Sequence, residues 1–145
     1  MTGLPLAQAK RIVDAALEKG RALKLAPLTV VVLDDRGCLK AAQSEDGSSL
    51  MRTGIATGKA WGVLGMGFGG RELARRAAKM PPSFFDALIG LSGGRMVPVP
   101  GGVLIRNADG EIVGAVGVSG DASEKDEDCA VHGIKAAGLA PDTGD

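Results

Sequence analysis

Apolar residues in the first part of the chain recur every three or four positions. They are Leu6, Ala9, Ile12, Val13, Ala16 and Leu17, with charged residues between them. This spacing predicts an amphipathic helix that packs on a sheet through one side. Pro27 ends the helical pattern, and the continuous apolar run 28–33 that follows is typical of a strand covered on both faces.

Two parts of the chain carry the signals of a β-hairpin. In each, an apolar run is followed by Asp or Asn, two further residues, Gly and a second run. The strand, turn and strand are 28–33, 34–37 and 38–43 in the first, and 103–106, 107–110 and 111–118 in the second. Asp or Asn at the first turn position and Gly at the last favour a tight turn, so both strand pairs are predicted to be antiparallel.

The run 111–118 is apolar on both of its sides. Strict alternation places Ile112, Val116 and Val118 on one face, and Val113, Ala115 and Gly117 on the other. The second face is built from small residues. We therefore predict a central strand, with a helix packed closely against its small face.

Three further helices are predicted. Residues 50–64 have a helical period, with Ser48 or Ser49 as the N-cap, and 72–79 form a short helix that a pair of prolines ends. The stretch 83–94 is predicted to be a loop with one helical turn at 84–88. In the last helix, Ser123 is the predicted N-cap, acidic residues suit the helix dipole, and the helix runs to about Ala137 before Gly138.

Gly54, Gly58 and Gly62 lie four residues apart in the helix predicted at 50–64. Each Gly inside a helix costs about 0.5–1 kcal/mol relative to Ala. The stripe therefore predicts close contact with another backbone, which either the sheet or another subunit supplies.

Length and charge bound the class of protein. The 145 residues predict a single domain over 1–145, with one core large enough to need no covalent staples. Seventeen basic and seventeen acidic residues leave no net field, which argues against nucleic acid as a partner. No signal peptide pattern and no run of 18 apolar residues is visible, so we expect a cytoplasmic protein that does not enter the membrane.

Cysteine and histidine are scarce. Cys38 and Cys129 are too few for a disulfide framework, and with His132 as the single histidine they make no metal cluster, so no metal site is predicted. The thiols are expected to be reduced, and their response to oxidants is left open. His132 is a candidate haem-iron ligand or proton carrier, although it lies off the stripe that packs the last helix, which favours an exposed histidine without a role.

Two other motifs have ordinary explanations. Gly65, Gly67 and Gly70 match the dinucleotide-binding pattern GxGxxG, but the segment before them is predicted to be a helix and the sheet antiparallel, so helix termination is favoured. Basic residues on the helix predicted at 72–79 and just before it are candidates for binding a carboxylate ligand. They are Arg71, Arg75, Arg76 and Lys79, and a solvated basic face is the favoured interpretation.

Several charged residues stand where loops and helix starts converge. Glu45, Lys59 and Asp126 are candidates for a ligand pocket, and a buried carboxylate and lysine are suited to acid and base work. Asp34 is the fourth residue of this group. Turn capping by Asp34, helix capping by Asp126 and simple exposure of Glu45 and Lys59 are the favoured interpretations. Gly101 and Gly102 either pass under a neighbouring element or offer backbone N–H groups to a ligand.

With these residues in view, the sequence resembles the GlcG/HbpS family of small haem-binding-type proteins, which includes the C-terminal domain of PduO-type proteins. The matching segments are TVVVLDDRGCLKAA at 29–42, Glu45 to Gly47, Ile55, Ala56, Lys59 and Ala60, PGGVLI at 100–105, GEIVGAVGVSG at 110–120, and DEDCA at 126–130 with Gly133 behind it. The resemblance covers nearly the whole chain. Trp61 and the glycine- and methionine-rich stretch 62–70 depart from the family pattern.

The resemblance implies a profilin-like α/β (α+β) fold, in which an antiparallel sheet of about five strands has helices on both faces. It also implies self-assembly into dimers or larger rings, a place in a catabolic gene cluster, and haem or another tetrapyrrole as the ligand. Ligand-binding residues would be Glu45, Lys59, Gly101, Gly102 and Asp126, with His132 as the axial candidate.

Two hypotheses compete with a haem-binding homo-oligomer. The first is an enzyme or accessory factor for a carboxylate metabolite, in which Lys59 and Asp126 are acid and base and the Gly101–Gly102 backbone holds the anion. The second is a purely structural or interaction module. The sequence shows no activated nucleophile, so whether the protein is an enzyme stays open at this point.

Overall fold

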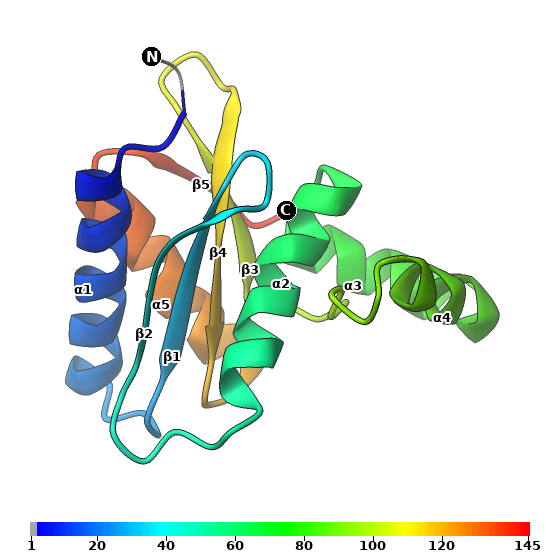
Figure 1. Cartoon of the computed structure of the whole chain (residues 1–145), viewed down its shortest axis with the longest axis horizontal. Coiled ribbons are helices and arrows are strands. Elements are labelled where there is room, and N and C mark those ends of the chain that lie inside the picture. Colours follow the sequence, from blue (N-terminus) through cyan, green and yellow to red (C-terminus); the bar gives the residue numbers. More distant parts are fainter. Residues whose placement is uncertain (1–2) are drawn as a thin grey trace.

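The computed structural model describes residues 3–145, which form one five-stranded sheet and five helices. In chain order the elements are α1 (Leu6–Ala22), β1 (Thr29–Asp34), β2 (Leu39–Ser44), α2 (Arg52–Met66), α3 (Gly70–Lys79), α4 (Pro82–Leu91), β3 (Gly102–Arg106), β4 (Ile112–Ser119), α5 (Ser123–Ala136) and β5 (Ala140–Asp142) (Figure 1). No helix in this described part combines the length and apolar character that a bilayer crossing requires.

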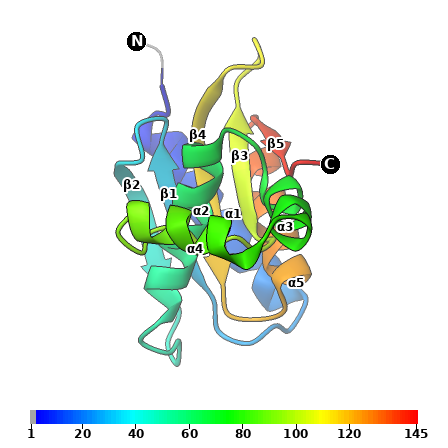
Figure 2. The ribbon, with the colours of Figure 1, turned by 90° about the vertical axis from the view of Figure 1, so that its right-hand side faces the viewer.

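The sheet is antiparallel throughout, with the strand order β2-β1-β4-β3-β5. Helices α1 and α5 cover one face, and α2 covers the other (Figure 1). Helices α3 and α4 continue away from the sheet beyond α2, so they form a projection from the body of the molecule (Figures 1 and 2). The predicted class is confirmed: about five antiparallel strands with helices on both faces.

The core has one layer on each face of the sheet. Val30, Val32 and Val116 face α1 and α5, whereas Val31 and Ala115 face α2. A third, small cluster of Leu73, Phe85 and Met96 lies in the projection. Burying each aliphatic side chain of this size contributes about 1.5–3 kcal/mol, so the two sheet layers hold most of the stability.

The small face of β4 allows the backbone of α2 to approach closely, as predicted. A Cβ on Gly117 would lie 1.8 Å from the carbonyl oxygen of Ala56. The glycine stripe of α2 has a different partner, because Gly58 and Gly62 pack against the segment 95–97, while Gly54 has no neighbour there. The contact is therefore made within the chain, by a loop rather than by the sheet.

The predicted alternation of β4 is wrong at its start. Ile105 pairs with Gly114 but Arg106 pairs with Ile112, so the register shifts and Val113 is left without a partner on β3. This bulge reverses two side chains. Val113 joins the α1/α5 layer and Ile112 packs against the α2 layer.

Three predictions about the helices are also wrong. The stretch predicted as a loop at 83–94 holds the ten-residue helix α4, because Pro82 occupies the first turn, where proline starts a helix rather than ending one. Helix α2 begins at Arg52 without a side-chain cap, so neither Ser48 nor Ser49 is its N-cap. The N-cap of α5 is Ala122, and Ser123 is the first helical residue.

The two outer strands differ in length and regularity. β2 pairs with β1 through a register irregularity between Val32 and Leu33. β5 has only three residues, including Pro141, and was not predicted from the sequence. Both edges of the sheet are therefore short or interrupted.

Candidate functional site

Lys59 and Asp126 form a buried ion pair between opposite layers of the molecule. Lys59 comes from α2 and Asp126 from the first turn of α5, and Lys59 Nζ lies 3.2 Å from Asp126 Oδ2. Lys59 Nζ also donates to the carbonyl oxygen of Val118 at 2.9 Å. The two side chains are only 4% and 1% exposed, so the pair is enclosed in one copy of the chain. The favoured prediction that Lys59 is exposed is therefore wrong, because the fold buries it against Asp126.

Burial sets the proton affinities of this pair. Loss of water lowers the pKa of Lys59 and raises the pKa of Asp126, and their mutual attraction opposes both shifts only in part. The other oxygen of Asp126 accepts a hydrogen bond from the backbone N–H of Asp121 at 2.9 Å. The two pKa values move towards each other, which is the arrangement that proton transfer between an amine and a carboxylate needs.

Gly101 and Gly102 lie directly against Lys59. A Cβ on Gly101 would be 2.9 Å from Lys59 Nζ, and one on Gly102 would be 2.3 Å from the Lys59 carbonyl oxygen. Gly101 also has φ of +116°, which favours glycine. The structure thus joins four predicted residues into one cluster, with the glycines passing closely under α2.

Two other predicted residues lie elsewhere. Glu45 Oε1 accepts a hydrogen bond from the backbone N–H of Leu28 at 2.8 Å, and Glu45 Oε2 pairs with Arg21 at 2.9 Å. These contacts fix the start of β1. His132 is exposed on α5, in the helix layer on the other side of the sheet from α2, α3 and α4 (Figure 1).

Sequence reasoning missed an ion pair that attaches the projection to the body. Arg71 at the start of α3 donates to Glu127 of α5 through Nε at 2.9 Å and Nη2 at 2.6 Å. Glu127 is 1% exposed, and its carboxylate holds the pKa of Arg71 above the usual range. The acidic run at 126–128 gave no signal for which of its members is buried. Only the fold brings Arg71 and Glu127 together.

The end of α2 together with α3 and α4 lines a second candidate site. Its walls are apolar, with basic side chains among them, and its volume is about 320 Å³. The lining residues are Met66, Arg76, Lys79, Met80, Phe84 and Phe85. We call this space the projection cavity.

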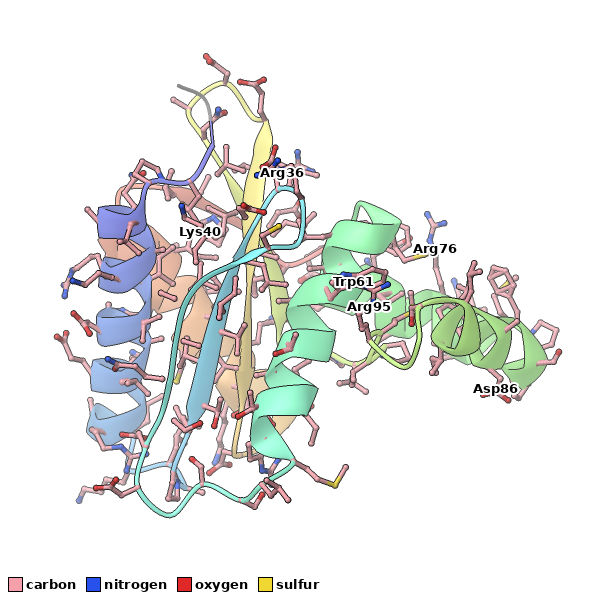
Figure 3. All side chains as sticks on the ribbon, viewed as in Figure 1. Arg36, Lys40, Trp61, Arg76, Asp86 and Arg95 are labelled. Carbon is pink, nitrogen blue, oxygen red and sulfur yellow. The ribbon has the colours of Figure 1, made fainter. Side chains whose placement is uncertain are left out.

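Two contacts shape the projection cavity. The rings of Phe84 and Phe85 meet edge to face, with centroids 5.4 Å apart. Arg76 lies over the ring of Phe68 at 4.3 Å and pairs with Glu72 at 2.9 Å, and Figure 3 shows it on the projection. Apolar walls beside basic side chains suit a flat, apolar ligand that carries carboxylates.

The sequence predicted the parts of this site but not the site itself. Arg76 and Lys79 were weighed as binders of a ligand carboxylate, and a solvated face was favoured. Met66 enters the sequence analysis only within the stretch 62–70 that departs from the family pattern, and Met80 has no predicted role. The missing element was α4, because a loop at 83–94 would not have placed Phe84 and Phe85 against α3.

Comparison with known protein families shows to which family the chain belongs. Residues 4–135 match the family model described as "Haem degrading protein HbpS-like". The protein belongs to the HbpS-like family. This confirms the resemblance found in the sequence, and the relatives of an HbpS-like protein are the proper comparison for its fold.

Solved structures agree over nearly the full length of this HbpS-like chain. A crystal structure of a PduOC:heme complex has a TM-score of 0.85 and 25% identity, covering 99% of this chain and 100% of that one. A double mutant of HbpS from Streptomyces reticuli has a TM-score of 0.78 and 26% identity, covering 93% and 87%. The protein ORFY from Klebsiella pneumoniae, at 22% identity and a TM-score of 0.83 over 95% and 93%, shares the fold.

Comparison with curated proteins finds no match. Among residues 3–145, no group of three or more His, Cys, Asp or Glu side chains is arranged to hold a metal ion. The assignment of a function therefore depends on the two sites described above and on the family.

Proposed function

We propose that the protein binds haem or a related tetrapyrrole in the projection cavity. The observation that carries the proposal is the composition of this cavity, where four large apolar side chains and two cations line one space of about 320 Å³. Family membership and the likeness to a haem complex support the choice of ligand.

The residues of the projection cavity fit the chemistry of haem. The faces of a tetrapyrrole are apolar and suit Phe84 and Phe85, while its propionate groups suit Arg76 and Lys79 at the basic side. The Lys59 cluster does not fit, because it is enclosed and its amine is already bonded to Asp126 and Val118. When bound, haem would supply electron-transfer or oxygen chemistry, and the protein would hold and orient it.

We also propose that the protein self-associates through the projection. The cavity lies at the small end of the range of ligand pockets, about 300–1,000 Å³, so one copy encloses only part of a tetrapyrrole. Met80 and Phe84, which line it, are 41% and 38% exposed, and Leu91 at the end of α4 is 84% exposed. A homo-oligomer would cover these side chains and the rest of the ligand.

The setting of the protein is part of the same proposal. A cytoplasmic location, a link to a catabolic pathway, and the lack of nucleic-acid and membrane partners are predictions from the sequence and the family resemblance. The balanced total charge supports the prediction about nucleic acid.

Titration with hemin tests the proposal. We expect a saturable shift of the Soret band, and we expect Lys79→Glu to weaken binding about tenfold, because it replaces a propionate partner by a like charge. Lys10→Glu, on an exposed position of α1, is the matched control and should bind as wild type does. The lack of saturation with wild-type protein would remove haem as the ligand.

The Lys59–Asp126 pair favours a second candidate function, acid–base catalysis on a carboxylate metabolite. The enzyme hypothesis requires the amine and a carboxylate within hydrogen-bond reach, and the 3.2 Å distance meets that requirement. Substrate access would need the Gly101 segment to move away from Lys59. Lys59→Met distinguishes the two functions in preparations that circular dichroism shows to be folded, since it would abolish turnover but leave hemin binding in the projection cavity unchanged.

A further inference from the structure

We infer that Met66 and Met80 supply sulfur ligands to the iron of the bound haem. The inference rests on the proposed haem binding and adds to it the residues that hold the metal. It concerns side chains that the sequence pattern and the family resemblance left without a role.

The donor chemistry of the projection cavity leads to this assignment. Of the six lining residues, the two phenylalanines offer no donor atom, and the guanidinium of Arg76 has no lone pair to give. Lys79, like Arg76, offers a basic group that suits a propionate. The thioether sulfurs of Met66 and Met80 are the remaining donors, and methionine is an established axial ligand of haem iron.

The backbone fixes both methionines. Met66 is the last residue of α2, and the left-handed Gly67 that follows donates its N–H to the Val63 carbonyl at 2.8 Å. Met80 directly follows α3, and its N–H donates to the Arg76 carbonyl at 3.0 Å. The two side chains thus enter one cavity from two helix ends whose backbone is hydrogen-bonded, and their flexible thioethers can adjust to a metal.

Two further residues with donor atoms suited to iron, His132 and Cys129, lie away from this cavity. His132 is exposed on α5, across the sheet from the projection (Figures 1 and 2). Cys129 is buried in the layer between α1 and α5, where burial raises the pKa of its thiol to about 11. Within a single copy, neither residue lines the space that the methionines share.

Thioether ligation has a consequence for the oxidation state of the iron. A methionine ligand raises the reduction potential of haem, which means that the protein binds the reduced form more tightly than the oxidised form. The projection cavity should therefore bind ferrous haem more tightly than ferric haem.

The test compares Met66→Leu and Met80→Leu with wild type. Leucine keeps the volume and apolar character of methionine but removes the sulfur. We expect each variant to weaken binding of dithionite-reduced haem about tenfold, the low end of what changes around a metal site cost, and to alter its absorption spectrum. Met51→Leu, on an exposed methionine outside the cavity, and His132→Ala should leave both unchanged.

Metal-free protoporphyrin separates the inference from the proposed function. It has the ring and the propionates but no iron, so quenching of its fluorescence should report equal affinity for wild type and both leucine variants. Wild type that binds neither porphyrin overturns both proposals. Haem binding and spectra that survive both leucine substitutions, or that change in His132→Ala instead, overturn the methionine assignment alone.

Discussion

The Lys59 cluster and the projection cavity both contain basic side chains, but they differ in whether a ligand can reach those side chains. In the cluster, the charges are buried, paired and packed against glycine backbone. In the projection cavity, the cations stand beside apolar walls and the site is open to a ligand. The buried, paired residues therefore connect the two helix layers, whereas we propose that ligand recognition falls to the accessible residues of the projection cavity.

Removing one partner of the buried pair should have the largest effect. We expect Lys59→Met or Asp126→Asn to lower the free energy of unfolding by about 3–5 kcal/mol, because each leaves a buried polar group unpaired. The double variant should lose much less than the sum of the two, since neither charge remains. Urea unfolding measures all three, and additive losses would show that the pair is not coupled.

Breaking the attachment of the projection should have an intermediate effect. Arg71→Met leaves the buried carboxylate of Glu127 unpaired, and we expect a loss of about 1–3 kcal/mol, reduced because Arg71 is 41% exposed. Hydrogen exchange in α3 should accelerate at the same time. Arg75→Met is the matched control, since Arg75 pairs with the more exposed Glu72 and its loss should leave the free energy of unfolding nearly unchanged.

The pH dependence of the free energy of unfolding should show the smallest effect. Its slope has a definite sign for each of the two residues. The raised pKa of Asp126 means that the folded protein keeps a proton that the unfolded chain loses, so stability falls as pH rises above the ordinary value of 3.8. The lowered pKa of Lys59 acts in the opposite direction, so stability rises with pH in the window below 10.5. Unfolding in urea across this range should show both slopes in wild type and neither in the double variant.

Local signals were sufficient for most of the fold. Both hairpins follow from Asp34, Asn107 and the glycines that close the turns, because such turns are decided by a few adjacent residues. The bulge at Val113 could not be predicted, since it depends on how β3 pairs with β4. Helix α4 was missed because Pro82 ends one helix and starts the next with the same local chemistry.

The candidate site was predictable only in part. Lys59 and Asp126 were chosen as an acid–base pair from where they stand in the expected fold, and the structure places them 3.2 Å apart across 67 positions of sequence. The partner of Glu127 was not predictable, because an acidic run does not reveal which carboxylate will be covered. The projection cavity depends on α4, so its lining could not be assembled before that helix was known.

The two edge strands of the sheet affect how copies of this protein can associate. β2 is interrupted in its pairing with β1 and carries Lys40 (Figure 3), and β5 is a three-residue strand with a proline. A lysine, a proline and a short length in an edge strand all disfavour pairing with a strand of another chain. Open-ended growth by strand pairing is thereby disfavoured, and we expect any closed assembly of copies to use helical surfaces instead.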